Sequence, residues 1–235
     1  MKLYLASGNP HKVGEFQALA SASLPDLEIL SARAVGGMPA VEEDTGTFTG
    51  NARKKARALK QLLPDEMWVL ADDSGLCVDA LAGAPGVESA YFAGPAGNAA
   101  ANLEKLIEVM RTVPVGRREA RFVCVLVLLG PDGGEQVFEG RCPGQLRVKP
   151  AGNAGFGYDP VFTPDGYTES YAALGEGIKN QISHRARAFA ALARWLRADP
   201  GGWRSKRDFT AKSLRLLSCL AHDYICDAEA VCVVT

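Results

Sequence analysis

The sequence predicts an α/β protein built on a mixed central β-sheet. Short apolar runs typical of strands alternate along the chain with segments whose apolar residues recur at helical spacing. Two long strand patterns, at residues 119–129 and 135–141, are separated only by the turn sequence PDGG, which is typical of an antiparallel hairpin. The alternation favours parallel strands connected through helices, and the hairpin adds antiparallel strands to the same sheet.

The expected elements follow in chain order. Strand patterns lie at 2–6, 27–30, 67–71, 119–129 and 135–141, and helical patterns begin at about Lys12 and cover 48–63, 98–110 and 183–197. The helix at 48–63 is rich in good helix formers and ends before Pro64. The strand at 67–71 is expected to end at Asp72 and Asp73, because the apolar pattern stops there.

One domain at residues 1–199 accounts for all of these elements. The character of the chain changes after the sequence DPGG at 199–202, so residues 200–235 are interpreted as a C-terminal extension of unknown role. A short helical pattern lies within this extension, at 211–220.

The composition argues against several classes of function. The 235 residues carry a formal net charge of −1, so we expect no DNA or RNA partner, because nucleic-acid binding needs a basic face. We expect a cytoplasmic protein without a membrane partner, since no signal peptide pattern and no apolar run of about 18 residues is present. The six cysteines form no CxxC pair, which favours reduced thiols over a zinc site.

A first cluster of candidate site residues joins the first strand to the first helix. Small residues let the backbone approach a ligand, a helix N-terminus favours an anion, and Lys12 adds a positive charge. A tight turn with a solvated lysine is the alternative interpretation. The members of the cluster are Ser7, Gly8, Asn9, Pro10, His11 and Lys12.

Carboxylates form the second and third clusters, at residues 42–44 (Glu-Glu-Asp) and at Asp72 and Asp73. Magnesium prefers oxygen ligands and commonly takes one or two protein carboxylates together with phosphate oxygens and water. Two aspartates at the end of an apolar strand therefore suggest a magnesium site. A cap or turn formed with Ser74 is an equally good alternative for this pair.

The fourth cluster is the sequence GFGYDP at 155–160, in which Phe156 is flanked by glycines. Because glycine has no side chain to screen the ring, Phe156 is expected to present a face to a nucleotide base. A structural turn with a buried phenylalanine is the alternative.

The fifth cluster contains hydrogen-bond donors at the start of the last helix. Lys179, His184 and Arg185 are suited to phosphates or a carbonyl oxygen, and Ser183 is expected to cap the helix. A capping or surface role is the alternative for His184. Lys55, on the helix at 48–63, is a further candidate cation.

In combination these clusters resemble the inosine triphosphate pyrophosphatase family, whose members act on non-canonical purine nucleotides. The resemblance covers residues 1–197. Any one of its motifs alone is weak evidence for the family, but seven motifs in the order of the family are specific evidence for it. They are SGNPHK at 7–12, EED at 42–44, TFTGNARKKA at 47–56, ADDSGLCVDALAGAPGVESA at 71–90, ARFVCVL at 120–126, GFGYDPVF at 155–162 and ISHRARA at 182–188. The family normally ends near residue 199, so the extension departs from it.

The resemblance implies an elongated two-lobed fold with a long active-site cleft, a homodimer, Mg²⁺ as cofactor, and hydrolysis of ITP, dITP and XTP to the monophosphate and pyrophosphate. By position, Asp73 matches the proton acceptor and a metal ligand, and Glu42 matches the other metal ligand, with Glu43 as an alternative. The matching nucleotide contacts are Ser7, Gly8, Asn9, Pro10, His11, Lys12, Lys55, Ser74, Phe156, Gly157, Tyr158, Asp159, Lys179, His184 and Arg185.

These residue types fit attack of a water molecule on the α-phosphorus, with Asp73 as general base and lysines offsetting the triphosphate charge. Hypoxanthine and xanthine carry a 6-keto acceptor for donors from His184 and Arg185, whereas adenine presents a 6-amino donor.

Two other functions stay open at this level. A pyrophosphatase of different specificity, such as the Maf-like proteins, would use similar chemistry. Comparing activity on a panel of nucleotides distinguishes it from an enzyme that acts on ITP, dITP and XTP. A nucleotide-binding regulator without catalysis is the other alternative. The carboxylates Glu42, Asp72 and Asp73 argue against it, because a binder needs no base.

Overall fold

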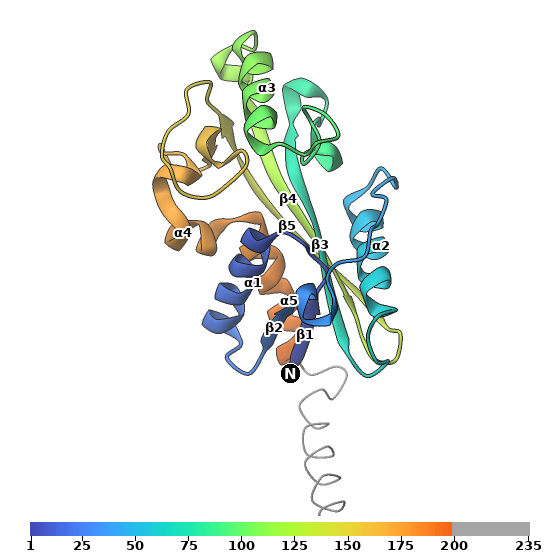
Figure 1. Cartoon of the computed structure of the whole chain (residues 1–235). Coiled ribbons are helices and arrows are strands. Elements are labelled where there is room, and N and C mark those ends of the chain that lie inside the picture. Colours follow the sequence, from blue (N-terminus) through green and yellow to red (C-terminus); the bar gives the residue numbers. More distant parts are fainter. Residues whose placement is uncertain (199–235) are drawn as a thin grey trace, which may run out of the picture. The chain divides into compact units, whose positions relative to one another are not determined.

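The structure is a computed structural model that describes residues 1–198 (Figure 1). Residues 2–194 form one compact unit that contains the whole sheet. The second unit, Met1 and residues from 195 onward, contributes only the end of the last helix to the described chain. The predicted extension at 200–235, with its helical pattern at 211–220, lies outside the described residues.

Six strands form one sheet in the order β2-β1-β3-β4-β5-β6. β1 is parallel to β2 and β3, whereas the β3–β4, β4–β5 and β5–β6 pairs are antiparallel. This topology confirms the predicted α/β class and the mixed sheet. The strands are β1 (Lys2–Leu5), β2 (Glu28–Ser31), β3 (Trp68–Val78), β4 (Glu119–Leu129), β5 (Glu135–Leu146) and β6 (Phe162–Pro164).

The prediction that β3 ends at the aspartates is wrong. β3 continues to Val78, and Asp72 and Asp73 pair in register with Leu126 and Val125 of β4. What ends there is the parallel pairing, because β1 reaches only as far as the Leu5–Leu70 pair. The two aspartates thus lie just beyond the carboxyl end of β1, the edge at which α/β sheets bind ligands.

Five α-helices surround the sheet: α1 (Pro10–Ser23), α2 (Phe48–Lys60), α3 (Ala99–Arg111), α4 (Tyr171–Ile182) and α5 (His184–Arg197). α1 begins two residues before the predicted start, since Asn9 caps the helix by accepting from two backbone N–H groups and Pro10 occupies the first turn. Both α4 and the short β6 were missed by the sequence analysis.

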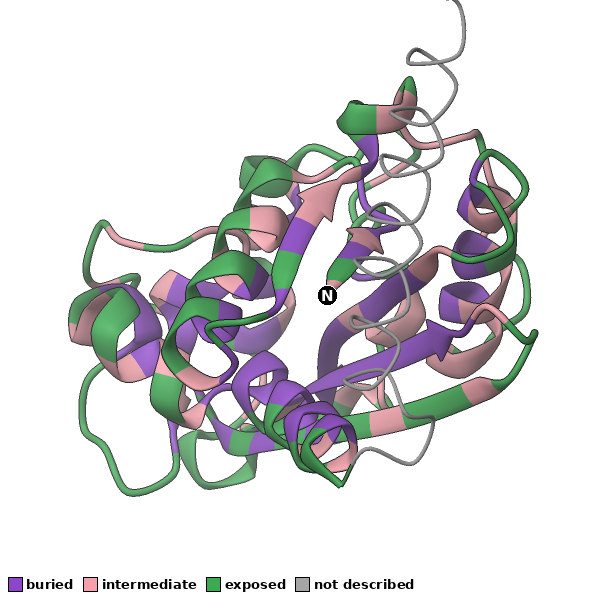
Figure 2. Ribbon diagram, turned by 90° about the horizontal axis from the view of Figure 1, so that it is seen from below, coloured by how far each residue is buried: buried purple, intermediate pink, exposed green. Residues whose placement is uncertain are grey.

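The helices cover both faces of the sheet (Figure 1). α2 packs Ala52, Ala56 and Leu59 against Val69 and Ala71 of β3. On the other face, α3 contributes Leu106 and Met110 to a second cluster around Leu76, Phe122 and Tyr171. Figure 2 shows the buried residues along the strands and on the helix sides that face them.

Side chains alternate along β3, so adjacent residues point to opposite faces. Val69, Ala71 and Asp73 share the face of α2, while Asp72 and Ser74 share the face of Leu76. The strand therefore delivers one carboxylate to each side of the sheet.

A close approach at Gly140 sets the position of the start of α5 on β5. A Cβ atom there would lie 2.2 Å from the carbonyl oxygen of His184 and 2.3 Å from the amide nitrogen of Ala188. We expect Gly140→Ala to lower the free energy of unfolding by about 1–3 kcal/mol, because either the helix or the strand must shift. Urea denaturation measures the change.

Gly116→Ala is the matched control, since a Cβ atom at Gly116 would meet nothing within 4 Å. Equal urea midpoints for the two variants would contradict this account of α5 packing.

Candidate active site

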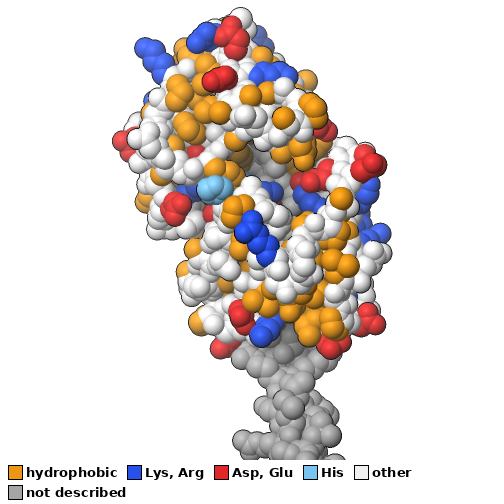
Figure 3. All heavy atoms as spheres, in the orientation of Figure 1, with side chains coloured by type: hydrophobic (Ala, Val, Ile, Leu, Met, Phe, Trp, Pro, Cys, Tyr) orange, Lys and Arg blue, Asp and Glu red, His pale blue; other side chains and the backbone are white. Residues whose placement is uncertain are grey.

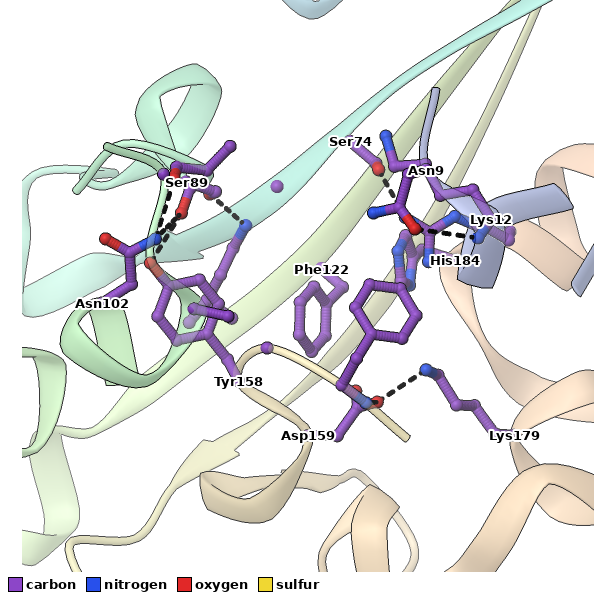
Figure 4. Close-up of a pocket in the computed structure, with 18 residues that line it drawn as sticks. Asn9, Lys12, Ser74, Ser89, Asn102, Phe122, Tyr158, Asp159, Lys179 and His184 are labelled. Atoms are coloured by element: carbon purple, nitrogen blue, oxygen red, sulfur yellow. Dashed lines mark hydrogen bonds and ion pairs between the residues drawn. The ribbon is translucent and has the colours of Figure 1, made fainter. Parts of the chain in front are cut away.

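A pocket opens on the Ser74 face of the sheet, next to the amino ends of α1 and α5 (Figure 4). In the space-filling view the face shown is hollowed, with acidic and basic side chains around the hollow (Figure 3). The lining residues are Asn9, Lys12, Ser74, Gly75, Leu76, Ser89, Ala90, Gly97, Ala99, Asn102, Phe122, Phe156, Gly157, Tyr158, Asp159, Lys179, His184 and Arg185. Most of the predicted nucleotide contacts thus meet in one pocket.

The other predicted residues lie beside this pocket rather than in its wall. Ser7 is buried and its Oγ accepts a hydrogen bond from the Asn9 N–H at 3.2 Å, which shapes the turn before α1. Gly8, Pro10 and His11 are exposed on the same turn. Lys55 and Asp73 belong to the α2 face of the sheet, and Glu42 lies on an exposed loop.

Asp72 is enclosed by cations on the pocket side of β3. Its Oδ2 lies 3.0 Å from Lys12 Nζ and 3.6 Å from Arg185 Nε, and it accepts a hydrogen bond from Ser74 Oγ at 3.1 Å. Burial alone raises the pKa of Asp72, but the charges of Lys12, Arg185 and Lys55 outweigh it and lower the pKa to about 2. Asp72 is therefore a permanent anion at neutral pH.

Asp73 meets a different cation on the opposite side of the strand. Lys55 Nζ donates to Asp73 Oδ1 at 2.7 Å and to Glu43 Oε2 at 2.9 Å, so one ammonium joins two carboxylates. Burial raises the pKa of Asp73 to about 6, and Lys55 and Lys12 offset only part of this effect. A carboxylate with this pKa can exchange a proton close to neutral pH.

The acidic groups around Asp73 are suited to part of a magnesium site. Asp73 Oδ2 is buried without a hydrogen-bond partner, and Glu43 contacts the same lysine. Glu42, the expected ligand, is exposed, whereas its neighbour Glu43 is the residue that contacts Lys55. Within residues 1–198, no three His, Cys, Asp or Glu side chains are grouped so that they could hold a metal ion by themselves.

Glu15 organises the cations at the other end of the pocket. It accepts from Lys179 Nζ at 2.8 Å and from Arg185 at 2.8 Å, and Lys179 also donates to Asp159 Oδ2 at 2.7 Å. Asp159 in turn accepts from the Phe156 N–H at 2.8 Å, which fixes the glycine-flanked turn. Burial raises the pKa of Asp159 although Lys179 opposes the shift.

Aromatic rings form the platform of the pocket. Lys179 Nζ lies 4.5 Å from the Phe156 ring centroid and Arg185 Cζ lies 5.4 Å from it, while the His11 ring stacks on Phe156 at 5.1 Å. Phe156 is half-buried and lines the pocket, so it does not belong to the core.

His184 lies in the pocket wall with its ring stacked on Phe122 at 4.8 Å (Figure 4). Burial and the nearby charges of Arg185, Lys179 and Lys12 lower the pKa of His184 well below its usual range. The ring is consequently neutral, and its buried Nδ1 has no hydrogen-bond partner. The N-cap role expected for Ser183 is confirmed, as its Oγ accepts from the Ala186 N–H at 3.2 Å.

The sequence analysis missed several residues that build this site. Glu15 lies three residues after Lys12 on α1, so helical spacing could have placed it on the same face. Asn102 and Ser89 carry no comparable signal. The Ser89 carbonyl oxygen accepts a hydrogen bond from the Tyr158 hydroxyl, and the Asn102 side-chain amide donates to the carbonyl oxygen of Ala90. Both residues therefore reach the site through contacts that only the folded chain makes.

Four of the five buried side-chain polar atoms that lack a hydrogen-bond partner in residues 1–198 lie around the candidate site. Such atoms are rare in folded proteins, because each costs free energy unless a ligand or water completes it. Here they surround the two carboxylates and the start of α5: Asp72 Oδ1, Asp73 Oδ2, His184 Nδ1 and Arg185 Nε. The two carboxylate oxygens can accept from a donor or bind a cation, and Arg185 Nε can donate to a negatively charged or polar ligand group.

The position of Glu15 predicts a pH-dependent contribution to stability. Burial raises the pKa of Glu15, but Arg185 and Lys179 outweigh it and hold the pKa below its usual range. A group with a lowered folded pKa stabilises the protein above its unfolded pKa, and the effect is lost as the pH falls through the folded pKa. Glu15→Gln should therefore lower the free energy of unfolding by about 1–3 kcal/mol at pH 7, with a smaller difference from wild type below about pH 4.

Denaturant titrations from pH 3 to 8 measure this difference. Glu104→Gln, on the exposed side of α3, is the control and should follow the wild type at every pH. A difference that does not change with pH would show that the charge of Glu15 is not responsible.

The whole described unit has counterparts of known family. Residues 3–195 match the model of the Ham1 family. A dITP/XTP pyrophosphatase of Opitutus terrae is 63% identical over 199 residues, 83% of this chain and 98% of the relative. A second dITP/XTP pyrophosphatase, of Bdellovibrio bacteriovorus, is 42% identical over 82% of this chain and 96% of the relative.

Solved structures agree with these matches. The Ham1 protein of Staphylococcus aureus has a TM-score of 0.74 at 36% identity and covers 85% of this chain and 100% of its own. A HAM1 protein of Coxiella burnetii has the same TM-score at 33% identity, with 84% and 99% covered. No helix among residues 1–198 has the length and apolar character to cross a membrane. Sequence and fold thus lead to the same conclusion: the chain belongs to the Ham1 family.

Proposed function

We propose that this protein hydrolyses the non-canonical purine nucleotides ITP, dITP and XTP to the monophosphate and pyrophosphate, and so removes them from the nucleotide pool. The observation that carries the proposal is Asp73, a buried carboxylate whose Oδ2 has no hydrogen-bond partner and whose pKa burial raises to about 6, adjacent in the chain to Ser74 of the cation-rich pocket. The Opitutus terrae relative, named a dITP/XTP pyrophosphatase, matches nearly all of the described chain.

The triphosphate is assigned to the end of the pocket near α1. There the turn at residues 7–12 and the amino end of the helix favour an anion, and Lys12 and Lys55 add positive charge. Lys12 and Lys55 pair with the neighbouring carboxylates Asp72 and Asp73, and both cations would offset part of the triphosphate charge.

Magnesium is assigned to Asp73 and one of the glutamates at 42–43. When bound, magnesium polarises the phosphoryl group and offsets the charge of the leaving pyrophosphate. The unpaired Asp73 Oδ2 and the Glu43 carboxylate, which shares Lys55 with Asp73, are the oxygen ligands that support this location.

Asp73 acts as the general base in this proposal. A water oxygen attacks the α-phosphorus, Asp73 takes the water proton, and the bond from the α-phosphorus to the bridging oxygen breaks as pyrophosphate leaves. Lys55, 2.7 Å from Asp73 Oδ1, holds the carboxylate in one orientation and leaves Oδ2 available to the water or the metal.

The base is assigned to Phe156, Lys179, His184 and Arg185. Phe156 stacks on the purine ring, and the donors of Arg185 and the neutral His184 favour a 6-keto oxygen over a 6-amino group. An adenine would leave a buried donor unpaired, at a cost of about 1–3 kcal/mol. Homodimerisation belongs to the same proposal and rests on the family resemblance, and a cytoplasmic location is proposed as the sequence analysis expects it.

Pyrophosphate release from equal concentrations of ITP, XTP, dITP, ATP, GTP and dTTP with magnesium tests the function. We expect release mainly from the first three, and Asp73→Asn should reduce it by about 100-fold or more, because general-base catalysis contributes factors of this size. Thermal melting of the variant shows whether its fold is retained.

The alternative functions give different outcomes. Release mainly from dTTP would support a Maf-like specificity, and release from none with tight nucleotide binding would support a regulator. Full turnover by Asp73→Asn would disprove its role as the base.

Magnesium titrations of Glu42→Gln and Glu43→Gln identify the glutamate ligand. The variant that lacks the ligand should need about 10-fold more magnesium for half-maximal activity and bind magnesium correspondingly more weakly in calorimetry. Glu88→Gln is the control, because Glu88 lines the same shallow surface hollow as Glu42 and Glu43. Wild-type magnesium dependence in both variants would exclude this pair as ligands.

A further inference from the structure

One fully buried carboxylate lies between the two ends of the pocket. The Asp72 side chain has no exposed surface, and its Oδ2 receives Lys12, Ser74 and Arg185 at 3.0, 3.1 and 3.6 Å. Its other oxygen, Oδ1, is buried without a hydrogen-bond partner. Lys12 and Ser74 thus share one oxygen, with Arg185 Nε at a longer distance, while the second acceptor atom stays unused.

The donors belong to opposite ends of the proposed substrate. Lys12 lies at the start of α1, where the triphosphate is assigned, and Arg185 lies at the start of α5, where the base is assigned. Arg185 also donates to Ser74 Oγ at 2.7 Å, so Ser74 forms a second connection between the guanidinium and Asp72. Figure 4 shows Ser74, Lys12 and His184 gathered on one side of the pocket.

The ligand-free arrangement is incomplete on the side of Arg185. Arg185 Nε lies 3.6 Å from Asp72 Oδ2, which is within ion-pair distance but too long for a hydrogen bond. Lys12 Nζ lies 3.0 Å from the same oxygen, which is hydrogen-bond length. A triphosphate that draws the Lys12 ammonium away would free Oδ2 for Arg185 Nε. A keto base that holds Arg185 in that orientation would, in turn, favour release of Lys12 to the phosphates.

We propose that Asp72 is a positioning residue that couples base recognition by Arg185 to placement of the triphosphate by Lys12. Asp72 touches no reacting atom and acts through the two cations. The inference rests on the proposed function and adds a source of selectivity to it. Because coupling between two binding sites is reciprocal, a base that fails to engage Arg185 leaves Lys12 held by Asp72 and the phosphates poorly placed.

The coupling predicts that loss of the Asp72 charge affects good substrates more than poor ones. Asp72→Asn keeps the shape of the side chain and removes its charge. We expect the ratio of kcat/KM for ITP to that for ATP to fall by about 10-fold, the value of one charge-assisted hydrogen bond. Asp72→Glu restores the charge and should recover part of the ratio. A carboxylate that only neutralises the cations would reduce activity on both nucleotides by the same factor.

The experiment measures kcat and KM for ITP and ATP with saturating magnesium in wild type, Asp72→Asn, Asp72→Glu and Glu135→Gln. Glu135 is the matched control. It forms an ion pair with Arg53 of α2 at 2.6 Å, and neither residue lines the pocket. Its variant should keep the wild-type ratio. In a double-mutant cycle, Arg185→Lys should cost much less selectivity in the Asp72→Asn background than alone.

An unchanged ITP to ATP ratio in folded Asp72→Asn, or additive effects in the cycle, would overturn the inference. If Asp72→Asn shows no cooperative thermal unfolding, Ser74→Ala carries the test, since it removes the second connection without changing charge. Ser74→Ala should then lower the ratio, and an unchanged ratio would overturn the inference equally. A wild type that hydrolyses neither nucleotide would instead refute the proposed function.

Discussion

Two adjacent carboxylates on one buried strand are the constraint around which the rest of the site is arranged. Because side chains alternate along a strand, Asp72 and Asp73 face opposite sides of β3, and burial of each requires its own cation. α1 supplies Lys12 on one side, and α2 supplies Lys55 on the other. The two helices must therefore pack where their lysines reach the strand, which ties the position of both helices to the chemistry.

Asp72 and Asp73 are neighbours in the chain but lie in different electrostatic environments. Asp72, facing Lys12 and Arg185, has its pKa lowered to about 2, whereas burial dominates at Asp73 and raises its pKa to about 6. Two adjacent groups of one chemical type thereby become suited to different tasks, a fixed anion and a proton acceptor. The amino ends of α1 and α5 converge beside them and add the positive ends of two helices to the pocket.

Those parts of the fold with a strong local signal were predicted well from the sequence. β4 is an uninterrupted apolar strand, and α2 and α3 have clear caps at Thr47 and Asn98. β3 was predicted too short because its two aspartates break the apolar pattern, although the ladder with β4 continues through them. α4 was missed because Gly175 has a positive φ inside it, and β6 has only three residues.

The sequence by itself determined the family and the α/β class and predicted a set of candidate site residues, because motif order and residue type are local properties of the chain. Only the tertiary structure decided which residues meet: that Glu43 rather than Glu42 reaches Lys55, that Glu15 joins Lys179 to Arg185, and that Asp72 and Asp73 face different helices. These contacts connect positions as far apart as Glu15 and Arg185, which are 170 residues apart in the chain. Such pairings depend on how strands and helices pack, and no local pattern records them.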